Sequence, residues 1–161
     1  MQREHAEGKY VIRAATIADA AAIAHHRVAM FRDMGILPEG EATELLAASH
    51  AYLMTALPSG QYLGWVVEAR GRIVAGGGAL LRRLLPRPGH VHGSEEAYLL
   101  NVYTDPQHRR RGLARQLMQL ILAWCDTRGI TRITLHASNA GRLVYQGLGF
   151  VDTNEMRLVL R

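Results

Sequence analysis

The N-terminal third of the chain has the apolar spacing of a strand followed by two helices. Residues 10–16 predict a short strand, Thr16 is a candidate helix N-cap, and Asp19 three residues later favours the helix N-terminus. Apolar residues then recur three and four positions apart, at Ile17, Ala20, Ile23, Ala24 and Val28. This spacing predicts a helix that ends at Gly35, and a second helix is predicted at about 41–57.

The middle of the chain changes to patterns that are typical of strands. Residues 62–69 and 72–81 are largely apolar, and Arg70-Gly71 between them predicts an antiparallel hairpin. Residues 97–105 are mostly apolar as well, as expected for a strand buried on both faces. The three glycines at 76–78 lack the helix and lysine of a nucleotide-binding loop, so they predict a bulge or a close approach of two backbones.

The strongest helical pattern covers residues 112–129, with an apolar stripe formed by Leu113, Leu117, Leu120, Ile121 and Trp124. A strand is predicted at 132–137, a short helix at 138–148, and a final pair of strands around a turn at Thr153-Asn154. The element order is β-α-α-β-β-β-α-β-α-β-β, which is of the α/β (mixed α+β) class. Because no repeat or long linker divides it, the chain is predicted to be one domain over residues 1–161.

Composition and charge narrow the class of protein. The chain is 48% apolar and 20% charged, as soluble globular domains are. Its net charge is +5 and Lys9 is its only lysine, so the positive charge is arginine, which suits phosphate binding. The base composition of a genome would produce the same bias. Cys125, the single cysteine, excludes an internal disulfide and a thiolate metal cluster. With no signal-like segment and no run of about 20 apolar residues, a cytoplasmic protein without membrane contact is expected.

Four arginines surround Gly112 in the stretch 109–115, between a predicted strand end and a predicted helix start. The first turn of a helix leaves backbone N–H groups unpaired and carries about half a positive charge. Gly112 lets a ligand approach the backbone, and Ala114 keeps the next turn open. This placement predicts a phosphate or pyrophosphate site. A nucleic-acid surface is not expected, because few basic residues follow Arg115 along the helix.

Two motifs carry a family resemblance. Residues 109–114 have the form R-x-x-G-x-A, and Tyr145, Gly149 and Phe150 form Y-x-x-x-G-F. Together they resemble the acyl-CoA-binding signature and the following motif of the GNAT superfamily of N-acetyltransferases. The resemblance implies a GNAT-like domain with a central, mixed, twisted sheet of about seven strands flanked by about four helices. It also implies acetyl-CoA as co-substrate and no metal.

The resemblance further implies roles for individual residues. Backbone amides of the arginine stretch would bind the CoA pyrophosphate, and the end of the preceding strand would pair with pantetheine. The implied cofactor-binding residues are Val102, Tyr103, Thr104, Arg109, Arg110, Arg111, Gly112, Leu113, Ala114, Arg115, Ser138 and Asn139. A strand N–H would polarise the thioester carbonyl. Tyr145 matches the family's general acid, and the alternative is that it only packs helix against sheet.

The general base is left open by the sequence. Leu100 occupies the position at which many family members carry a glutamate. Glu95 and Glu96 are the nearest carboxylates and the candidates for the base, and a solvated loop position is an equal alternative for both. His136 lies in an apolar strand and is expected to be a core histidine.

The sequence therefore predicts an N-acetyltransferase, an acyltransferase that acts on a primary amine of a small molecule or peptide by direct attack in a ternary complex. A non-catalytic acyl-CoA-binding module or sensor on the same fold is the alternative, and Leu100 is its best support. The loops at 33–40 and 86–96 are expected to shape the acceptor site. Neither the acceptor nor the oligomeric state follows from the sequence, and a homodimer is compatible with it.

Overall fold

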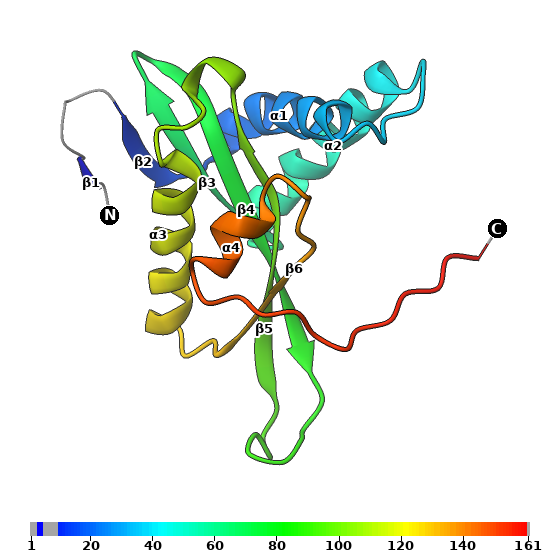
Figure 1. Cartoon of the computed structure of the whole chain (residues 1–161), viewed down its shortest axis with the longest axis vertical. Helices are drawn as coiled ribbons and strands as arrows, with labels where there is room; N and C mark the ends of the chain where they lie inside the picture. Colours follow the sequence, from blue (N-terminus) through cyan, green and yellow to red (C-terminus); the bar gives the residue numbers. More distant parts are fainter. Residues whose placement is uncertain (1–2, 5–9, 161) are drawn as a thin grey trace.

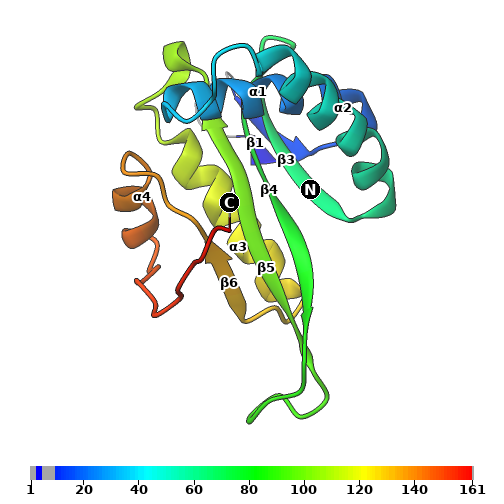
Figure 2. The same ribbon diagram turned by 90° about the vertical axis from the view of Figure 1, so that its right-hand side faces the viewer.

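The computed structural model describes residues 3–4 and 10–160, which form one six-stranded sheet with helices on both faces (Figures 1 and 2). The strands lie side by side in sequence order and are β1 (Arg3–Glu4), β2 (Val11–Ala14), β3 (Tyr62–Ala69), β4 (Arg72–Leu84), β5 (Ser94–Thr104) and β6 (Arg132–Leu135). Neighbouring strands are antiparallel except β5 and β6, which run parallel. The sheet is therefore mixed, as the resemblance implies.

Two layers of helices cover the sheet. The helices are α1 (Ala20–Asp33), α2 (Ala42–Ser59), α3 (Leu113–Thr127) and α4 (Arg142–Gln146), with single 3-10 turns at η1 (Ile17–Asp19) and η2 (Pro106–His108). The first two helices pack on one face, and α3 and α4 lie on the other (Figure 2). The four predicted helices are thus all present.

The apolar residues of the sheet alternate between two cores, one under each helical layer. In β3, Trp65 and Val67 belong to the core on the α3 side, whereas Tyr62 and Val66 belong to the core under α1 and α2. The stripe of α3 that faces the sheet is almost fully buried at Leu113, Leu117, Met118, Ile121 and Cys125. Burial of both faces explains why the central strands are almost continuously apolar.

Asp19 fixes the junction between β2 and α1. Its carboxylate accepts hydrogen bonds from the Thr16 backbone N–H at 2.8 Å and from two guanidinium nitrogens of Arg13 at 2.8 and 2.9 Å. These contacts, the Arg13 hydrogen bond above all, lower the pKa of Asp19. Thr16 is the N-cap of the η1 turn, so the helix start predicted there is confirmed to within one turn.

A β-bulge interrupts the pairing of β4 with β5. Gly78 pairs with Leu100 and Gly76 with Tyr103, so β5 contains one residue more than β4 over this interval. Asn101 lies within it and has a φ of 57°. A Cβ added at Gly78 would lie 2.2 Å from the hydroxyl oxygen of a β3 tyrosine. The predicted bulge is therefore present, and Gly78 makes room for a side chain of β3.

The chain after α4 differs from the expectation. In the described part of the chain no strand follows α4, and residues 151–160 form an exposed, extended segment instead of a strand pair around Thr153-Asn154 (Figure 1). With β1 added at the other end, the described sheet has six strands rather than about seven. Alternating apolar residues favour an extended backbone, but they do not supply the neighbouring strand that pairing requires. Of the helices described, none is long and apolar enough to cross a membrane.

Candidate functional site

The junction between β5 and α3 displays unpaired backbone N–H groups. After η2 the chain passes through Arg110 and Gly112, both in the left-handed region with φ of 57° and 73°. The first hydrogen bond of α3 runs from the Gln116 N–H to the Gly112 oxygen at 3.0 Å. The N–H groups of the three residues before Gln116 therefore have no helical acceptor, and with the helix dipole they suit an anion.

The arginines of this junction fall into two groups. Arg109 donates to a backbone oxygen at the end of β5 at 2.9 Å and pairs with Asp33 at the end of α1, which raises the pKa of Arg109. It therefore ties the junction to two other elements. Arg110 has no hydrogen-bond or ion-pair partner among the described residues, and Arg111 and Arg115 reach only backbone oxygens at 3.5 Å. These three guanidinium groups are available to an anion.

Strands β5 and β6 separate beside this junction, and the space between them after Leu99 and Leu135 is here called the gap. Their parallel pairing runs from Glu96 with Arg132 to Leu99 with Leu135 and then stops. Beyond this point β5 pairs only with β4, so its other backbone edge is open over residues 100–104 in the part of the chain that is described. Three of the expected cofactor-binding residues lie along this open stretch: Val102, Tyr103 and Thr104.

Ser138 and Asn139 lie in the turn that leads from β6 to α4. The Ser138 hydroxyl accepts a hydrogen bond from the Gly141 N–H at 3.1 Å within this turn, and the N-cap of α4 is Gly141 instead of Ser138. Asn139 is exposed. The turn that carries both residues connects the end of β6 to α4 (Figure 1).

Tyr145 packs on α4 against the core shared with α3. Its ring meets that of Phe150 edge-on, with centroids 5.9 Å apart, and burial raises the pKa of its phenol. Gly141 makes room for it, because a Cβ there would lie 2.9 Å from the ring. Within the described residues the Tyr145 hydroxyl has no hydrogen-bond partner. The residue therefore packs helix against sheet and keeps an uncommitted proton.

The two glutamates expected near the base lie at the other end of β5. Glu96 is buried in the strand and pairs with Arg132 at 3.0 Å and with Arg82 at 3.8 Å, while Glu95 is half-buried opposite β4. At about 3.3 Å per residue, Glu96 lies on the order of 20 Å along the strand from Val102. The structure does not bring either glutamate to the gap, and neither lies in a solvated loop.

A hydrogen-bonded pair of side chains, Tyr98 and His136, lies where β5 and β6 separate, and the sequence did not predict it. The Tyr98 hydroxyl is 2.6 Å from the His136 Nδ1, and the Arg82 guanidinium stacks 3.9 Å from the Tyr98 ring centroid. The His136 Nε2 is 3.7 Å from a carboxylate oxygen of Glu155. Half of the His136 side chain is exposed, so the expectation of a core histidine is wrong. The alternation of apolar Leu135 with polar His136 was the signal in the sequence.

The bulge is held from the side of α1. Arg27 donates a hydrogen bond to the Asn101 side-chain oxygen, and the Asn101 amide donates to the Tyr62 hydroxyl at 3.4 Å. Burial raises the pKa of Tyr62 to about 12, so it remains neutral. These contacts come from α1 and β3 and could not be assigned from spacing. They hold the left-handed conformation of Asn101 in place.

The two loops expected to shape an acceptor site lie at opposite ends of the molecule. The loop 33–40 joins α1 to α2, whereas the turn that contains His90 and His92 is the tip of the β4–β5 hairpin (Figure 1). A cavity of about 350 Å³ lies between α1, the start of α2 and the end of β5. Asp105 lines it, with a carboxylate oxygen 3.5 Å from the His26 Nε2. Among the described residues, no cluster of three metal-ligating side chains occurs.

Fold and site together define an α/β protein with two adjacent features. One is a candidate anion-binding site at the start of α3, here called the anion seat, and the other is the open edge of β5 beside it. The chain belongs to the acetyltransferase (GNAT) family, whose model matches residues 22–150. The resemblance drawn from the two sequence motifs is therefore confirmed at the level of the family.

Named relatives are N-acetyltransferases. The chain is 31% identical over 104 residues to N-acetyltransferase family 8 member 3 of Mus musculus. This match covers 63% of this chain and 44% of that protein. It is 41% identical over 66 residues to the [Ribosomal protein bS18]-alanine N-acetyltransferase of Salmonella typhimurium, covering 39% and 45%. The matched part thus spans less than half the length of each relative.

Solved structures match over nearly the whole chain. A GCN5-related N-acetyltransferase from Ralstonia eutropha JMP134 superposes with a TM-score of 0.85 at 33% identity, covering 94% of this chain and 98% of that one. A predicted acetyltransferase from Clostridium acetobutylicum, solved with acetyl-CoA, gives a TM-score of 0.82 at 27% identity, covering 94% and 96%.

Proposed function

We propose that this protein is an N-acetyltransferase that moves the acetyl group of acetyl-CoA to a primary amine of a small molecule or peptide, by direct attack in a ternary complex. The open backbone edge at 100–104, next to the free N–H groups at the start of α3, carries the proposal. A strand edge pairs with the amides of an extended ligand, and a helix start takes phosphates. An extended ligand with a pyrophosphate fits both features.

The residues of the junction divide the binding among them. The pyrophosphate would be held by the backbone N–H groups of the 110–115 stretch and by the guanidinium groups of Arg110, Arg111 and Arg115. The side chain of Leu113 is buried, so it and Ala114 contribute through the backbone. Pantetheine would pair with Val102 to Thr104, within reach of the Ser138–Asn139 turn. Arg109, which is bound to Asp33, would position the junction instead of touching phosphate.

The bulge would polarise the thioester carbonyl. Acetyl-CoA supplies an activated acyl group, and its C–S bond breaks as the amine attacks the carbonyl carbon. A bulge leaves one residue outside the strand ladder, so a backbone N–H near Asn101 is free to donate to the carbonyl oxygen. Because Arg27 and Tyr62 hold Asn101, this dipole is fixed before the reaction begins.

Tyr145 would donate the proton that the departing thiolate needs. Its hydroxyl proton is not committed to another residue in the described chain, and it lies on α4, across the gap from the open edge of β5. The departing thiolate, whose thiol has a pKa of about 8.5, is a weaker base than tyrosinate, whose phenol has a pKa of about 10. Transfer of the proton from tyrosine to the thiolate is therefore uphill at equilibrium. It assists only when it accompanies C–S cleavage.

His136, paired with Tyr98, would accept the proton of the attacking amine. An alkylamine with a pKa of about 10 is mostly protonated at neutral pH and must lose a proton before it attacks. Histidine is the side chain whose charge changes most readily near neutrality, and His136 is half-exposed beside the gap. Glu96 is enclosed by two arginines and far from the gap, and Glu95 is its neighbour in β5. A structural role therefore suits both glutamates better.

The proposed acceptors are primary amines of small molecules and peptides. The Salmonella relative is named for an alanine of a ribosomal protein, which makes a peptide N-terminus one member of the class. A non-catalytic acyl-CoA-binding module is the second candidate. It is favoured by Leu100, which packs into the core under α1 and α2 at the position where many family members carry a glutamate.

Release of free thiol from acetyl-CoA over a panel of amines, polyamines, amino acids, antibiotics and peptides tests the proposal. We expect saturable release with at least one primary amine, and acetylation of that amine by mass spectrometry. Tight binding of acetyl-CoA without release across the whole panel would favour the binding module. Absence of acetyl-CoA binding by calorimetry would contradict both candidates.

A further inference from the structure

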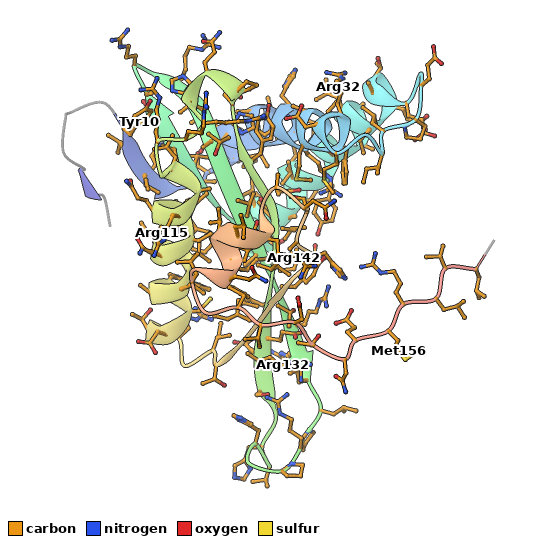
Figure 3. All side chains as sticks on the ribbon, viewed as in Figure 1. Tyr10, Arg32, Arg115, Arg132, Arg142 and Met156 are labelled. Atoms are coloured by element: carbon orange, nitrogen blue, oxygen red, sulfur yellow. The ribbon has the colours of Figure 1, made fainter. Side chains whose placement is uncertain are left out.

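The segment after α4, residues 151–160, is here called the C-terminal arm, and it exposes most of its apolar side chains. Five large ones, Val151, Met156, Leu158, Val159 and Leu160, are 75–94% exposed. In the described chain the arm forms no backbone–backbone hydrogen bond. It runs away from the body of the molecule, with Met156 far from the helices (Figures 1 and 3). Apolar side chains clustered in this way mark an interaction surface.

The arm has the pattern of a strand without a ladder. Met156, Leu158 and Leu160 alternate with Arg157 and Val159, so an extended backbone puts the first three on one face. No proline interrupts the stretch, and every residue from 156 to 160 can donate a backbone N–H. What the arm lacks is a strand edge to pair with.

An open edge is available at β6. This strand pairs with β5 on one side only, and it is the last strand of the sheet. A cavity of about 430 Å³ runs along it, between residues 133–137 and residues 150–157 of the same chain, and α4 forms its end. An edge strand next to a cavity accepts an additional strand.

The arm of the same chain borders this cavity as far as Arg157 but does not pair with the edge of β6. Asp152 pairs with Arg142 of α4, and Glu155 pairs with His136, so the first half of the arm is held along the outer wall of the cavity. No turn forms at the candidate Thr153-Asn154, and the chain leaves the cavity wall after Arg157. Filling the cavity from within the chain would need a reversal at 155–157, where no glycine, proline or asparagine stands.

We propose that residues 156–160 of one copy pair as a strand with the open edge of β6 in a second copy, and that the exchange is reciprocal. Donor and acceptor lie on the same chain, so one two-fold axis satisfies both at once. Each copy would contribute its arm and the cavity walls that receive the partner's arm, about 20 residues. This is the size of one side of a standard protein interface.

The exchange would close the wall of the site beside His136. That histidine lies at the mouth of the same cavity, so the arm of the second copy would run next to it. The inference concerns assembly alone, and its test does not depend on acetyl transfer.

The test is the solution mass of the chain, measured by sedimentation equilibrium and light scattering at micromolar concentration. We expect twice the chain mass of 17.8 kDa. Leu158→Asp should raise the dissociation constant at least about tenfold, because a charge would replace a buried leucine. The matched control is Leu85→Asp, which changes an equally exposed leucine outside the arm and should leave the mass unchanged.

Two further measurements identify strand pairing. In a paired strand, alternate N–H groups are bonded, so of Leu158→Pro and Val159→Pro one should disrupt the dimer much more than the other. Amide hydrogen exchange of residues 156–160 should be slow in the wild-type dimer and fast in Leu158→Asp. Circular dichroism spectra of the variants serve as the control for folding.

Each contrary result would overturn the proposal. A monomer with slowly exchanging arm amides would mean that the arm folds back onto its own chain. A monomer with fast-exchanging amides would mean a free tail. A dimer that survives both Leu158→Asp and removal of residues 156–161 would use another surface.

Discussion

Burial of Tyr145 has opposite effects on the two requirements of its proposed role as a general acid, which are to stay protonated and to release the proton. The raised pKa keeps the phenol protonated to higher pH than an exposed tyrosine, so the acid is always loaded in the neutral range. It also makes the proton harder to give away, because the acceptor is a thiolate. As the proposed acid, Tyr145 would therefore act only in concert with bond cleavage.

This balance predicts the pH behaviour of the Tyr145→Phe variant. Removing the hydroxyl should lower kcat by roughly 10²–10⁴-fold and change the KM for acetyl-CoA little, because the ring still packs on Phe150. Since the pKa is raised, the deficit should persist to the alkaline end of the profile, and no loss of wild-type rate from tyrosine ionisation should occur below about pH 10. Steady-state pH profiles of both proteins measure this. Equal rates at all pH values would remove Tyr145 from the chemistry.

His136 is the proposed general base, and its role can be tested separately from that of Tyr145. His136→Gln should lower kcat at least about tenfold, because the amide cannot take up the amine proton. The control is His90→Gln, which changes the hairpin tip and should leave kcat unchanged. Thiol release with the best amine of the panel gives both values. A larger loss in a folded Glu96→Gln variant than in His136→Gln would return the role of base to Glu96.

At the scale of elements, the start of α3 depends more on backbone conformation than on any single guanidinium. Gly112 has a φ of 73°, and space around it is open, since an added Cβ would meet only the Gln116 amide nitrogen at 3.9 Å. The penalty for a side chain there is therefore conformational, about 1–3 kcal/mol, and falls on the turn that aims the N–H groups.

We expect Gly112→Val to abolish measurable CoA binding and Arg110→Ala only to weaken it. Arg110 is one of three guanidinium groups that form no ion pair among the described residues. Its own φ of 57° means that Arg110→Gly should keep the backbone conformation while removing the charge. Isothermal titration with CoA ranks the three variants. The reverse order of Gly112→Val and Arg110→Ala would show that charge, not backbone geometry, carries the site.

Local signals in the sequence were sufficient for the helix starts and the hairpin. Thr16 and Asp19 act through neighbouring backbone, and Arg70-Gly71 makes its own turn, so short windows determine them. Partners distant in sequence were not predictable in the same way. The pair of Tyr98 with His136 depends on the register between two strands, and the arm depends on a neighbour that a single chain does not supply.

At the scale of the whole molecule, the two helical layers divide the expected tasks. The anion seat lies at the start of α3, and the Arg27 and Tyr62 contacts that hold the bulge come from the layer of α1 and from β3. Cys125 is fully buried in the core on the α3 side, and burial raises the pKa of its thiol. A covalent acyl carrier is therefore not favoured by this arrangement, which agrees with direct transfer between two bound molecules.

The extra residue at Asn101 also inverts β5. Leu99 packs toward α3 and Leu100 toward α1 and α2, and Val102 again packs toward α3, where simple alternation would turn it the other way. Tyr103 accordingly meets His26 of α1, with ring centroids 5.0 Å apart. The alternation of side chains between the two faces of β5 thus shifts by one residue at the point where the strand's edge opens. Loss of one residue here would not merely shorten the strand. It would turn its last three side chains inside out, so this position is far less open to insertion or deletion in evolution than the tip of the hairpin.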